Sequence, residues 1–574
     1  MRFSLGNIVS IGLLARLGQC VPSRPTTLEP RGPGACFTPS NRACWSPGFD
    51  INTDYETKTP PGVVRTFNWE VTEHDNWTGP DGRIKSKVML VNNQYPGPTL
   101  KADWGDTVVV NIKNSLRING TSFHWHGIRQ LGTNIMDGTN GVTECPVPPG
   151  ASKTYTFRFT QYGTTWYHSH FSGQYGNGVF GPIVINGPAS LPYDIDLGAY
   201  PINDYYLKTA DELIVETQHT PAPPKSDNVL FNGTNINPAG SGGAYSRITV
   251  TPGKRHLLRL INTSVENNFQ VSIVGHDMTV VATDLVPVNS FTTNNVFLGI
   301  GQRVDVTIDA SKTPGNYWMN VTMPASSRCG LSLNPAPAAI VHYANAPVAN
   351  PTTPGIPPPD AQCSDSLSYV PVVSRQAPLN QFTPGPKNTL DINFQTSPLV
   401  FWTINNTSIN VDWDRPVLDY VLKGNTSYPA SENVVIVDQK DVWTFWVLEN
   451  IPNVPHPIHL HGHDFLVLGT GAGSFTAADK ASLRGANPVR RDVTMLPGQG
   501  WLVLAFKADN PGNWIMHCHI AWHVSGGMAV DFLERVPEQK AQVSAADSTA
   551  FQDNCARWRG YFDNSGIVKI DSGL

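Results

Sequence analysis

Ten histidines gather in four short clusters that could bind transition metals. The clusters are His124 with His126, His168 with His170, His456 with His459 and His461, and His517 with His519 and His523. Because side chains two residues apart on a strand point to one face, each His-x-His pair presents two imidazoles to one site. Imidazole is a ligand for copper, iron, nickel and zinc, and a thiolate among imidazoles favours copper or zinc. The clusters therefore indicate a centre for several metal ions.

Cys518 lies between two of these histidines and is expected to face away from both, because successive strand residues point to opposite faces. One metal can then take the thiolate, while the flanking imidazoles bind other metals. A thiolate, two histidines and a weak axial methionine form the blue-copper ligand set. His456, Cys518 and His523 would supply the trigonal ligands, and Met528 is placed to be axial, although a core methionine is the alternative. The other eight histidines are enough for three more coppers.

A strand pattern that occurs three times must position these ligands. Residues 105–114, 252–262 and 441–450 each contain a turn and then a β-branched or aromatic run that ends at asparagine. This is a strand signature. The spacing of the turns and the absence of long helical periodicity favour antiparallel sandwiches. The sequence therefore predicts an all-β chain with three β-sandwich domains.

Comparison of the repeats separates the metal ligands from the scaffold. The Pro-Gly-Asn turn of the third repeat leads to His517-Cys518-His519, whereas the same turn of the second repeat leads to Asn320-Val321-Thr322. The first and third repeats thus carry histidine clusters and the middle one does not. Since the middle repeat keeps its strand pattern without them, the histidines are not needed for folding.

The composition excludes some classes of protein. Only 15% of the residues are charged, Gly and Pro number 50 and 48, and the net charge is −5. This composition is typical of a turn-rich extracellular protein, and the charge gives no reason to expect a nucleic-acid partner. The sequence has no run of about 18 apolar residues, so no membrane span is predicted.

Several features predict a secreted, extracellular protein. Residues 1–35 are interpreted as a signal peptide and pro-segment. Eight Asn-x-Ser/Thr sequons point the same way: Asn76, Asn119, Asn232, Asn262, Asn320, Asn405, Asn406 and Asn425. Of the eight cysteines, Cys20 lies in the signal region and Cys518 is the candidate ligand. The other six could form three disulfides in an oxidising compartment, and the sequence permits fifteen pairings.

The four clusters, in this order and with this cysteine, resemble the multicopper oxidase family over nearly the whole chain after residue 35. The ending Asp571-Ser572-Gly573-Leu574 is similar to that of ascomycete laccases in the family. The resemblance implies a laccase with four copper ions, one of type 1, one of type 2 and a type 3 pair. Such an enzyme oxidises phenolic substrates of the benzenediol type by one electron and reduces O2 to water. The resemblance also implies cupredoxin-like Greek-key domains at residues 36–190, 191–370 and 371–574.

The resemblance assigns a role to each candidate residue. His124 and His459 would bind the type 2 copper, and the type 3 pair would take His126, His168, His170, His461, His517 and His519. The implied disulfides are Cys36–Cys44, Cys145–Cys555 and Cys329–Cys363. Asp137 matches a carboxylate that relays protons, Trp522 an aromatic residue of the reducing-substrate pocket, and Leu574 the end of a tail that inserts toward the copper cluster. The alternatives are a turn aspartate, a core tryptophan and a disordered terminus.

Two positions depart from the laccase pattern. Many fungal laccases have Leu or Phe where this chain has Met528, and a thioether ligand should lower the potential of the type 1 copper. Related laccases often carry an acidic residue in the loop that corresponds to residues 236–247, where it accepts the phenol proton. That loop contains no Asp or Glu here.

Two other functions remain open at this stage. A metallo-oxidase that oxidises Fe(II) would need carboxylates beside His456 and His523, for which Asp464 and Asp531 are candidates. A non-catalytic copper binder is the second alternative, but it would have no use for a complete set of four copper sites. The chain is expected to be a monomer.

Overall fold

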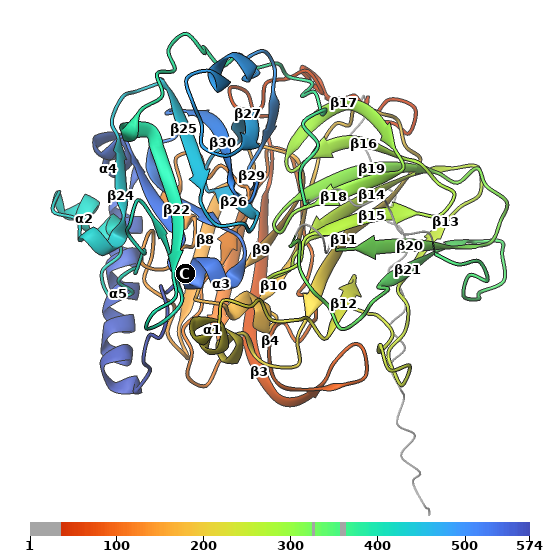
Figure 1. Ribbon diagram of the computed structural model, residues 1–574, viewed down its shortest axis with the longest axis horizontal. Helices are drawn as coiled ribbons and strands as arrows, with labels where there is room; N and C mark the ends of the chain where they lie inside the picture. The colour runs from red at the N-terminus through yellow and green to blue at the C-terminus, as the bar shows by residue number, and fades with distance from the viewer. Residues whose placement is uncertain (1–35, 324–327, 356–362) are drawn as a thin grey trace, which may run out of the picture.

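Strands dominate the structure, a computed structural model that describes residues 36–323, 328–355 and 363–574. The predicted signal and pro-segment, with Cys20, lies outside these residues. Figure 1 shows the strands in three groups that follow one another along the chain. This arrangement confirms the prediction of an all-β fold with three sandwiches. Among the described residues, no helix is long and apolar enough to cross a bilayer.

The first group contains two four-stranded sheets that enclose one hydrophobic core. In spatial order, the first sheet holds β4 (Ile84–Val91), β3 (Val64–Thr78), β6 (Thr107–Asn114) and β8 (Ser152–Arg158). The second sheet holds β5 (Leu100–Asp103), β10 (Phe180–Asn186), β9 (Gly163–His168) and β7 (His124–Trp125). A small ribbon of β1 (Cys44–Ser46) and β2 (Phe49–Asp50) precedes them.

The second group has a six-stranded and a five-stranded sheet. The first consists of β12 (Asn228–Phe231), β11 (Ile195–Tyr205), β14 (Arg255–Asn262), β19 (Arg303–Asp309), β16 (Met278–Thr283) and β17 (Val286–Thr293). The second consists of β13 (Arg247–Val250), β21 (Ala338–Tyr343), β20 (Asn316–Thr322), β15 (Phe269–Ile273) and β18 (Asn295–Leu298).

The third group repeats the plan of the second. Its six-stranded sheet holds β23 (Phe401–Ile404), β22 (Thr389–Gln395), β25 (Trp443–Asn450), β30 (Gly500–Lys507), β27 (Phe465–Ala472) and β28 (Val489–Arg491). Its five-stranded sheet holds β24 (Val434–Val437), β32 (Ala529–Glu534), β31 (Gly512–Cys518), β26 (His456–Leu460) and β29 (Val493–Leu496).

The three repeated segments found in the sequence become β6, β14 and β25, which occupy the same place in their sheets. Each pairs in parallel with the preceding long strand of its own group. Each ends at an asparagine whose side chain donates two hydrogen bonds to backbone carbonyls. Asn114 bonds to Asn119 and Val147, Asn262 to Asn267 and Leu298, and Asn450 to Val454 and Pro497, all at 2.7–2.9 Å. The repeated asparagine thus holds the loop that follows the strand.

Because its side chain holds the following loop, Asn262 is excluded as one of the predicted glycosylation sites. The Asn262 side chain is fully buried and its amide nitrogen is committed to two carbonyls. A glycan needs an exposed amide, so Asn262 is not an acceptor in the folded protein. By contrast, Asn76, Asn232, Asn405 and Asn406 are exposed.

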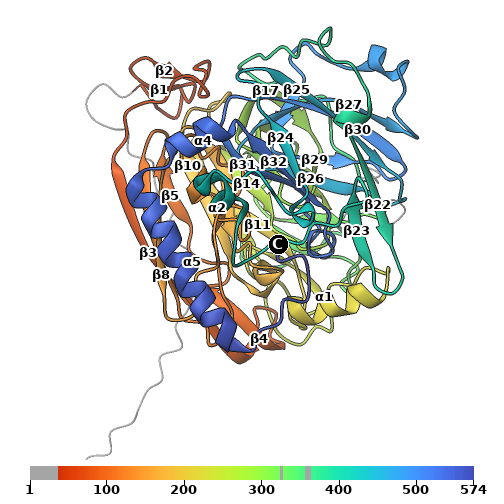
Figure 2. The ribbon, with the colours of Figure 1, turned by 90° about the vertical axis from the view of Figure 1, so that its left-hand side faces the viewer.

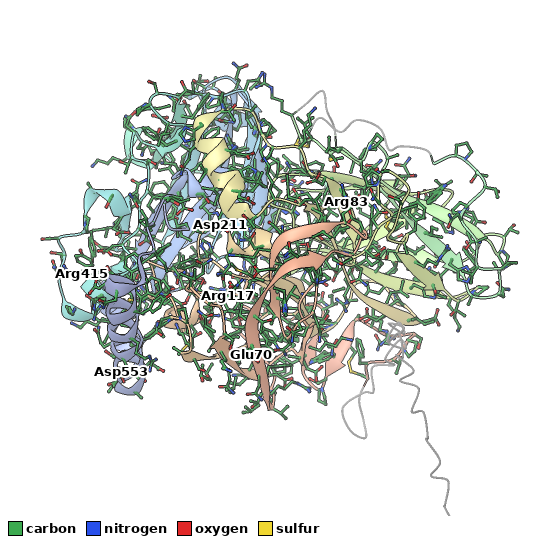
Figure 3. The ribbon with its side chains drawn as sticks, turned by 90° about the horizontal axis from the view of Figure 1, so that it is seen from below. Glu70, Arg83, Arg117, Asp211, Arg415 and Asp553 are labelled. Atoms are coloured by element: carbon green, nitrogen blue, oxygen red, sulfur yellow. A yellow bond between two sulfur atoms is a disulfide. The ribbon has the colours of Figure 1, made fainter. Side chains whose placement is uncertain are left out.

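The described residues form five helices between or beside the sandwiches: α1 (Ala210–His219), α2 (Val417–Lys423), α3 (Ala521–Ser525), α4 (Val536–Gln542) and α5 (Ala545–Ser565). Short 3-10 turns span Asn134–Met136, Gln174–Asn177, Pro386–Asn388, Ala430–Glu432 and Asp479–Ser482. Helix α1 begins with a capping box between Thr209 and Glu212. Asp211 in its first turn, labelled in Figure 3, accepts a hydrogen bond of 2.8 Å from Asn177 and so ties α1 to the first sandwich.

The disulfides implied by the resemblance are confirmed. Cys36 pairs with Cys44, Cys145 with Cys555, and Cys329 with Cys363, whereas Cys518 is free and buried. The Cys145–Cys555 bridge joins the first sandwich to α5, which runs along one side of the molecule in Figure 2. The first sandwich and α5 are therefore linked covalently.

Candidate metal centre

Three ligand atoms meet on one side of β31. The Sγ atom of Cys518 lies 3.6 Å from Nδ1 of His456 and 3.5 Å from Nδ1 of His523, and these two nitrogens are 3.1 Å apart. Burial lowers the pKa of His456 to about 3, so its imidazole is neutral and offers a lone pair. The three atoms can therefore surround a single metal ion.

Met528 adjoins this site through its backbone. Its N–H donates to the carbonyl of His523 at 2.9 Å, and its carbonyl accepts from the N–H of Cys518 at 3.2 Å. The side chain is completely buried. This position fits Met528 as the predicted thioether ligand. Helix α3 creates it, because the helix turns the chain back toward Cys518.

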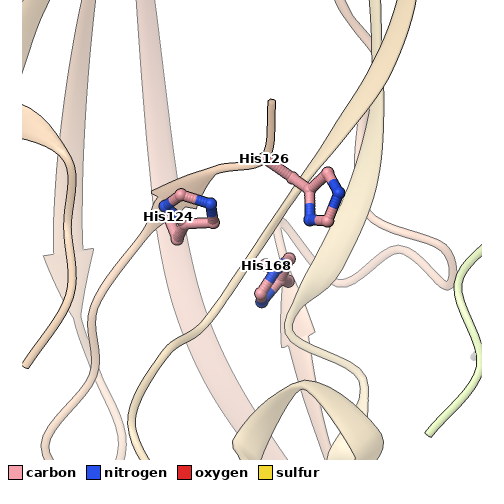
Figure 4. A group of neighbouring side chains, drawn as sticks. All are labelled: His124, His126 and His168. Atoms are coloured by element: carbon pink, nitrogen blue, oxygen red, sulfur yellow. The ribbon is translucent and has the colours of Figure 1, made fainter. Parts of the chain in front are cut away.

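The other eight histidines lie together on the opposite side of Cys518. Candidate groups with ligand atoms within 4.8 Å of one another are His124–His126–His168, His124–His459–His461 and His170–His461–His517. Figure 4 shows the first group, in which the three rings surround one space. His519 completes the set, with its Nε2 3.3 Å from Nδ1 of His126.

Strand pairing explains why residues from distant parts of the sequence converge. His124 of β7 lies opposite His168 of β9, and His459 of β26 lies opposite His517 of β31. Directly opposed residues project from the same face of a sheet, so each pair places two rings at one site. Ile458 lies opposite Cys518, on the other face. The thiolate therefore faces away from the imidazoles, as the sequence predicted.

Unpaired nitrogens provide the test of whether a metal fits. The Nε2 atoms of seven of these histidines are buried and have no hydrogen-bond partner among the described residues: His124, His126, His168, His170, His459, His461 and His517. Buried polar atoms without a partner are rare, and here they face one another. Burial, with repulsion between the rings, lowers the pKa of His168, His170, His459 and His461 well below the usual value. Neutral imidazoles with free lone pairs fit metal ions.

Hydrogen bonds at the opposite nitrogen fix the orientation of several rings. The Nδ1 atom lies near the carbonyl of Asp137 for His124, of Asp492 for His459 and of Cys518 for His517, at distances of 3.0, 2.8 and 2.8 Å. Such contacts place the proton on Nδ1 and leave Nε2 for the metal.

Two buried carboxylates support this arrangement. Asp137 Oδ2 accepts from Nδ1 of His461 at 2.8 Å. Asp492 lies 3.2 Å from Nε2 of His126 and accepts from Arg303 of the second sandwich at 2.6 Å. All three sandwiches therefore contribute to the surroundings of the histidines. The sequence analysis missed Asp492 and Arg303, because nothing in their spacing relates them to the ligands.

A cavity of about 600 Å³ opens beside His523. Trp522, Trp402 and Phe394 give it aromatic walls, and Trp402 packs on His523 with ring centroids 4.0 Å apart. Glu266 also lines the cavity and is only 6% exposed. Its Oε2 atom makes no hydrogen bond to any described residue. Burial, with repulsion from Asp204, raises the pKa of Glu266 well above its usual value.

Comparisons with known proteins agree with this geometry. Family models described as multicopper oxidase match residues 45–190, 198–346 and 360–538, which is most of the chain. The chain belongs to the multicopper oxidase family. It is an oxidoreductase of the fungal laccase type, because its high-identity curated relatives are laccases. The fold is accordingly cupredoxin-like, and the family together with the histidine clusters supports copper binding.

Three proteins illustrate the relation of this laccase to its family. Laccase-1 of Melanocarpus albomyces is 57% identical, with 95% of this chain and 90% of the relative covered. The laccase of Cryphonectria parasitica is 55% identical, with 98% of both chains covered. The crystal structure of the laccase from Botrytis aclada has a TM-score of 0.87 and 37% identity, and covers 94% of this chain and 99% of its own.

The C-terminal tail of this laccase lies against the histidines. Leu574 is 1% exposed and lines a small cavity with His168, His170, His517 and His519. The tail is held by hydrogen bonds from Trp413 to the carbonyl of Gly573 at 2.9 Å and from Ser572 to the carbonyl of Val524 at 2.7 Å. The tail is therefore ordered and lies where insertion toward the histidine cluster would place it.

Glu266, and not the loop at residues 236–247, supplies the carboxylate of the described cavity lining. Residues 236–247 do not appear among the described residues that line the cavity, and Gly243 packs instead against Asn235 and Asp81. The carboxylate in the cavity wall, that of Glu266, belongs to the loop after β14. In the sequence, the only sign of Glu266 as a candidate was its position shortly after Asn262, where a repeated strand ends. The sequence does not show which loop reaches His523.

Proposed function

We propose that this laccase is a secreted monomer that oxidises phenols in the cavity beside His523 and reduces O2 at the histidine cluster. Overall, four phenols and one O2 would give four phenoxyl radicals and two waters. Four copper ions would supply the one-electron chemistry. The type 1 ion would be held by His456, Cys518, His523 and Met528. His124 and His459 would hold the type 2 ion and the remaining six histidines the type 3 pair. The domain boundaries predicted from the sequence are part of this proposal.

The observation that carries the proposal is the position of His523. This residue belongs to the cysteine-containing group and also lines the aromatic cavity. An aromatic reductant can therefore approach a ligand directly. Cys518 is covalently adjacent to His517 and His519, so the chain itself links the two groups.

The residues of the cavity have separate tasks in this proposal. Trp522 and Trp402 would hold the phenol ring by packing, and Glu266 Oε2 would receive the hydroxyl proton. Asp137 would orient His461 and relay protons to the cluster. The Leu574 carboxylate would line the path to the same histidines.

Iron oxidation is less well supported by the cavity. The carboxylates considered for Fe(II) are engaged elsewhere: the half-buried Asp464 accepts from Tyr55 at 2.7 Å, and the buried Asp531 accepts from Asn513 at 3.2 Å. Neither lines the cavity beside His523. Glu266 is the only carboxylate among the described lining residues, and the burial that raises its pKa disfavours the charged form that a cation would need.

The test is O2 uptake by the copper-loaded protein with a methoxyphenol and with Fe(II) as parallel reductants. We expect rapid uptake with the phenol, slow uptake with Fe(II) and about four coppers per chain. Rapid uptake with Fe(II) alone would move the function to metal oxidation. One copper per chain and no uptake would indicate a non-catalytic copper binder.

Replacement of Glu266 by glutamine should lower kcat/KM for phenols by about 10- to 100-fold, because a general base is lost. Since the pKa of Glu266 is raised, the basic form accumulates only as pH rises. The rate of phenol oxidation by the wild type should therefore rise as pH increases and Glu266 loses its proton. The Glu266→Gln variant should not show this rise. Oxidation of ferrocyanide, which has no proton to give, is the control and should stay unchanged. Equal losses for both donors would contradict a proton-accepting role.

Deletion of residues 571–574 should lower turnover while the copper content stays normal. The tail contributes Leu574 to the small cavity beside four histidines but holds no nitrogen ligand. Its removal opens that cavity to water without removing a ligand. Turnover under air and copper per chain are the two measurements, and the Leu574→Ala variant separates the side chain from the terminal carboxylate. Unchanged O2 turnover in the truncated protein would refute a role for the inserted tail at the histidine cluster.

A further inference from the structure

The substrate cavity contains one cation that the proposed function does not use. Its described lining includes three ionisable side chains, those of Glu266, Arg328 and His523. Burial raises the pKa of the Glu266 carboxyl well above its usual value, which favours its neutral form, and His523 is assigned as a ligand. Arg328 therefore supplies the remaining formal charge of the cavity wall, since a guanidinium is always protonated.

Arg328 is held on the same wall as Glu266. The residues after Glu266 bind the residues after Arg328: the Asn268 N–H donates to the carbonyl of Cys329 at 2.8 Å, and Asn267 Oδ1 accepts from the N–H of Leu331 at 2.9 Å. The Cys329–Cys363 disulfide anchors the second segment. These hydrogen bonds and the disulfide therefore fix the backbone near Arg328 relative to the backbone near Glu266.

The local backbone also supports a functional role for this side chain. Arg328 has a φ of 58°, in the left-handed region that favours glycine and asparagine. The Arg328 side chain is exposed and lines the cavity. An unfavourable backbone conformation that presents an exposed charge to a binding cavity suggests a ligand for that charge.

The remaining lining defines what kind of ligand fits. Phe394, Trp402 and Trp522 accept an aromatic ring, and Glu266 accepts a hydroxyl proton. A guanidinium prefers a carboxylate, which it can bind through two parallel hydrogen bonds. We propose that Arg328 selects phenols that carry a carboxylate, such as hydroxybenzoates and hydroxycinnamates. This inference rests on the proposed function, since it names the substrate class of the same cavity.

The experiment compares 4-hydroxy-3,5-dimethoxybenzoate with its methyl ester at pH 6. The wild type should prefer the acid, and Arg328→Met should lower the acid-to-ester ratio of kcat/KM about three- to tenfold, mainly through KM. Arg328→Glu should lower the ratio further. Added salt should weaken the preference of the wild type only, because it screens the ion pair.

Two controls separate specificity from general damage. Arg557→Met removes an exposed arginine of α5 that does not line the cavity and should leave the ratio unchanged. Calorimetric binding of 4-methoxycinnamate, which lacks the reacting hydroxyl, should weaken by a similar factor in Arg328→Met. Identical ratios and identical binding in the wild type and both Arg328 variants would overturn the inference. If the wild type oxidises neither the acid nor the ester, the proposed function fails, while the binding measurement still tests Arg328.

Discussion

Replacement of Cys518 by serine is expected to abolish phenol-driven O2 uptake while the fold remains intact. The thiol sits 3.5–3.6 Å from two imidazole nitrogens and is the only free cysteine among the described residues. Loss of a residue that merely orients a ligand costs about 10- to 100-fold, so loss of the thiolate itself should cost more than about a hundredfold. The protein should also lose the intense visible absorption that a thiolate gives to copper(II).

Ile515→Val on the same strand is the matched control. Ile515 is fully buried in β31 but contributes no ligand. The Ile515→Val substitution should lower the free energy of unfolding by about 0.5–1.5 kcal/mol and leave the colour and turnover unchanged. Cys518→Ser with normal colour and normal uptake would show that this group does not bind the electron-accepting copper.

Replacement of Asp137 by asparagine should have the second largest effect. Oδ2 of this carboxylate accepts from His461 at 2.8 Å and from Thr139 at 2.8 Å, and the carbonyl lies 3.0 Å from Nδ1 of His124. Asparagine keeps the size and one acceptor but removes the charge. We expect normal copper content, about a 10- to 100-fold lower kcat and a larger solvent isotope effect.

Two further variants distinguish orientation from proton relay. Asp137→Ala removes the acceptor as well and should lower the copper content, which Asp137→Asn should not. Asp277→Asn changes an exposed aspartate of the middle sandwich and should have no effect. Wild-type kcat in Asp137→Asn would contradict a role for the charge, and copper loss in that variant would reduce Asp137 to an orienting residue.

The sequence was informative wherever the constraint was local. Alternation along a strand was enough to predict that Cys518 and its histidine neighbours face different sites, and cross-strand pairing at Ile458 agrees. The repeated strand ending at asparagine correctly predicted three equivalent sheets. Their common asparagine has a physical reason that the sequence does not show, since it bonds to carbonyls up to 47 residues away.

The residues that the sequence analysis missed are those brought in by long-range packing. Arg303 and Asp492 are 189 residues apart, and their ion pair forms only where the second and third sandwiches meet. Glu266 reaches the cavity because the loop after β14 lies beside α3, where the N–H of Ala521 donates to the carbonyl of Val265 at 2.9 Å. Periodicity reports the direction of a side chain but not which loop lies opposite it.

The Cys145–Cys555 bridge constrains how the protein is made. Its cysteines are 410 residues apart, so at ribosomal rates of about 5–20 residues per second Cys145 must wait about 20–80 s for its partner. Cys36 and Cys44, only 8 residues apart, can pair almost at once. During that interval the first sandwich carries Cys145 without its native partner. The native Cys145–Cys555 bridge can therefore close only after α5 has been synthesised, so the covalent link between the first sandwich and α5 forms late.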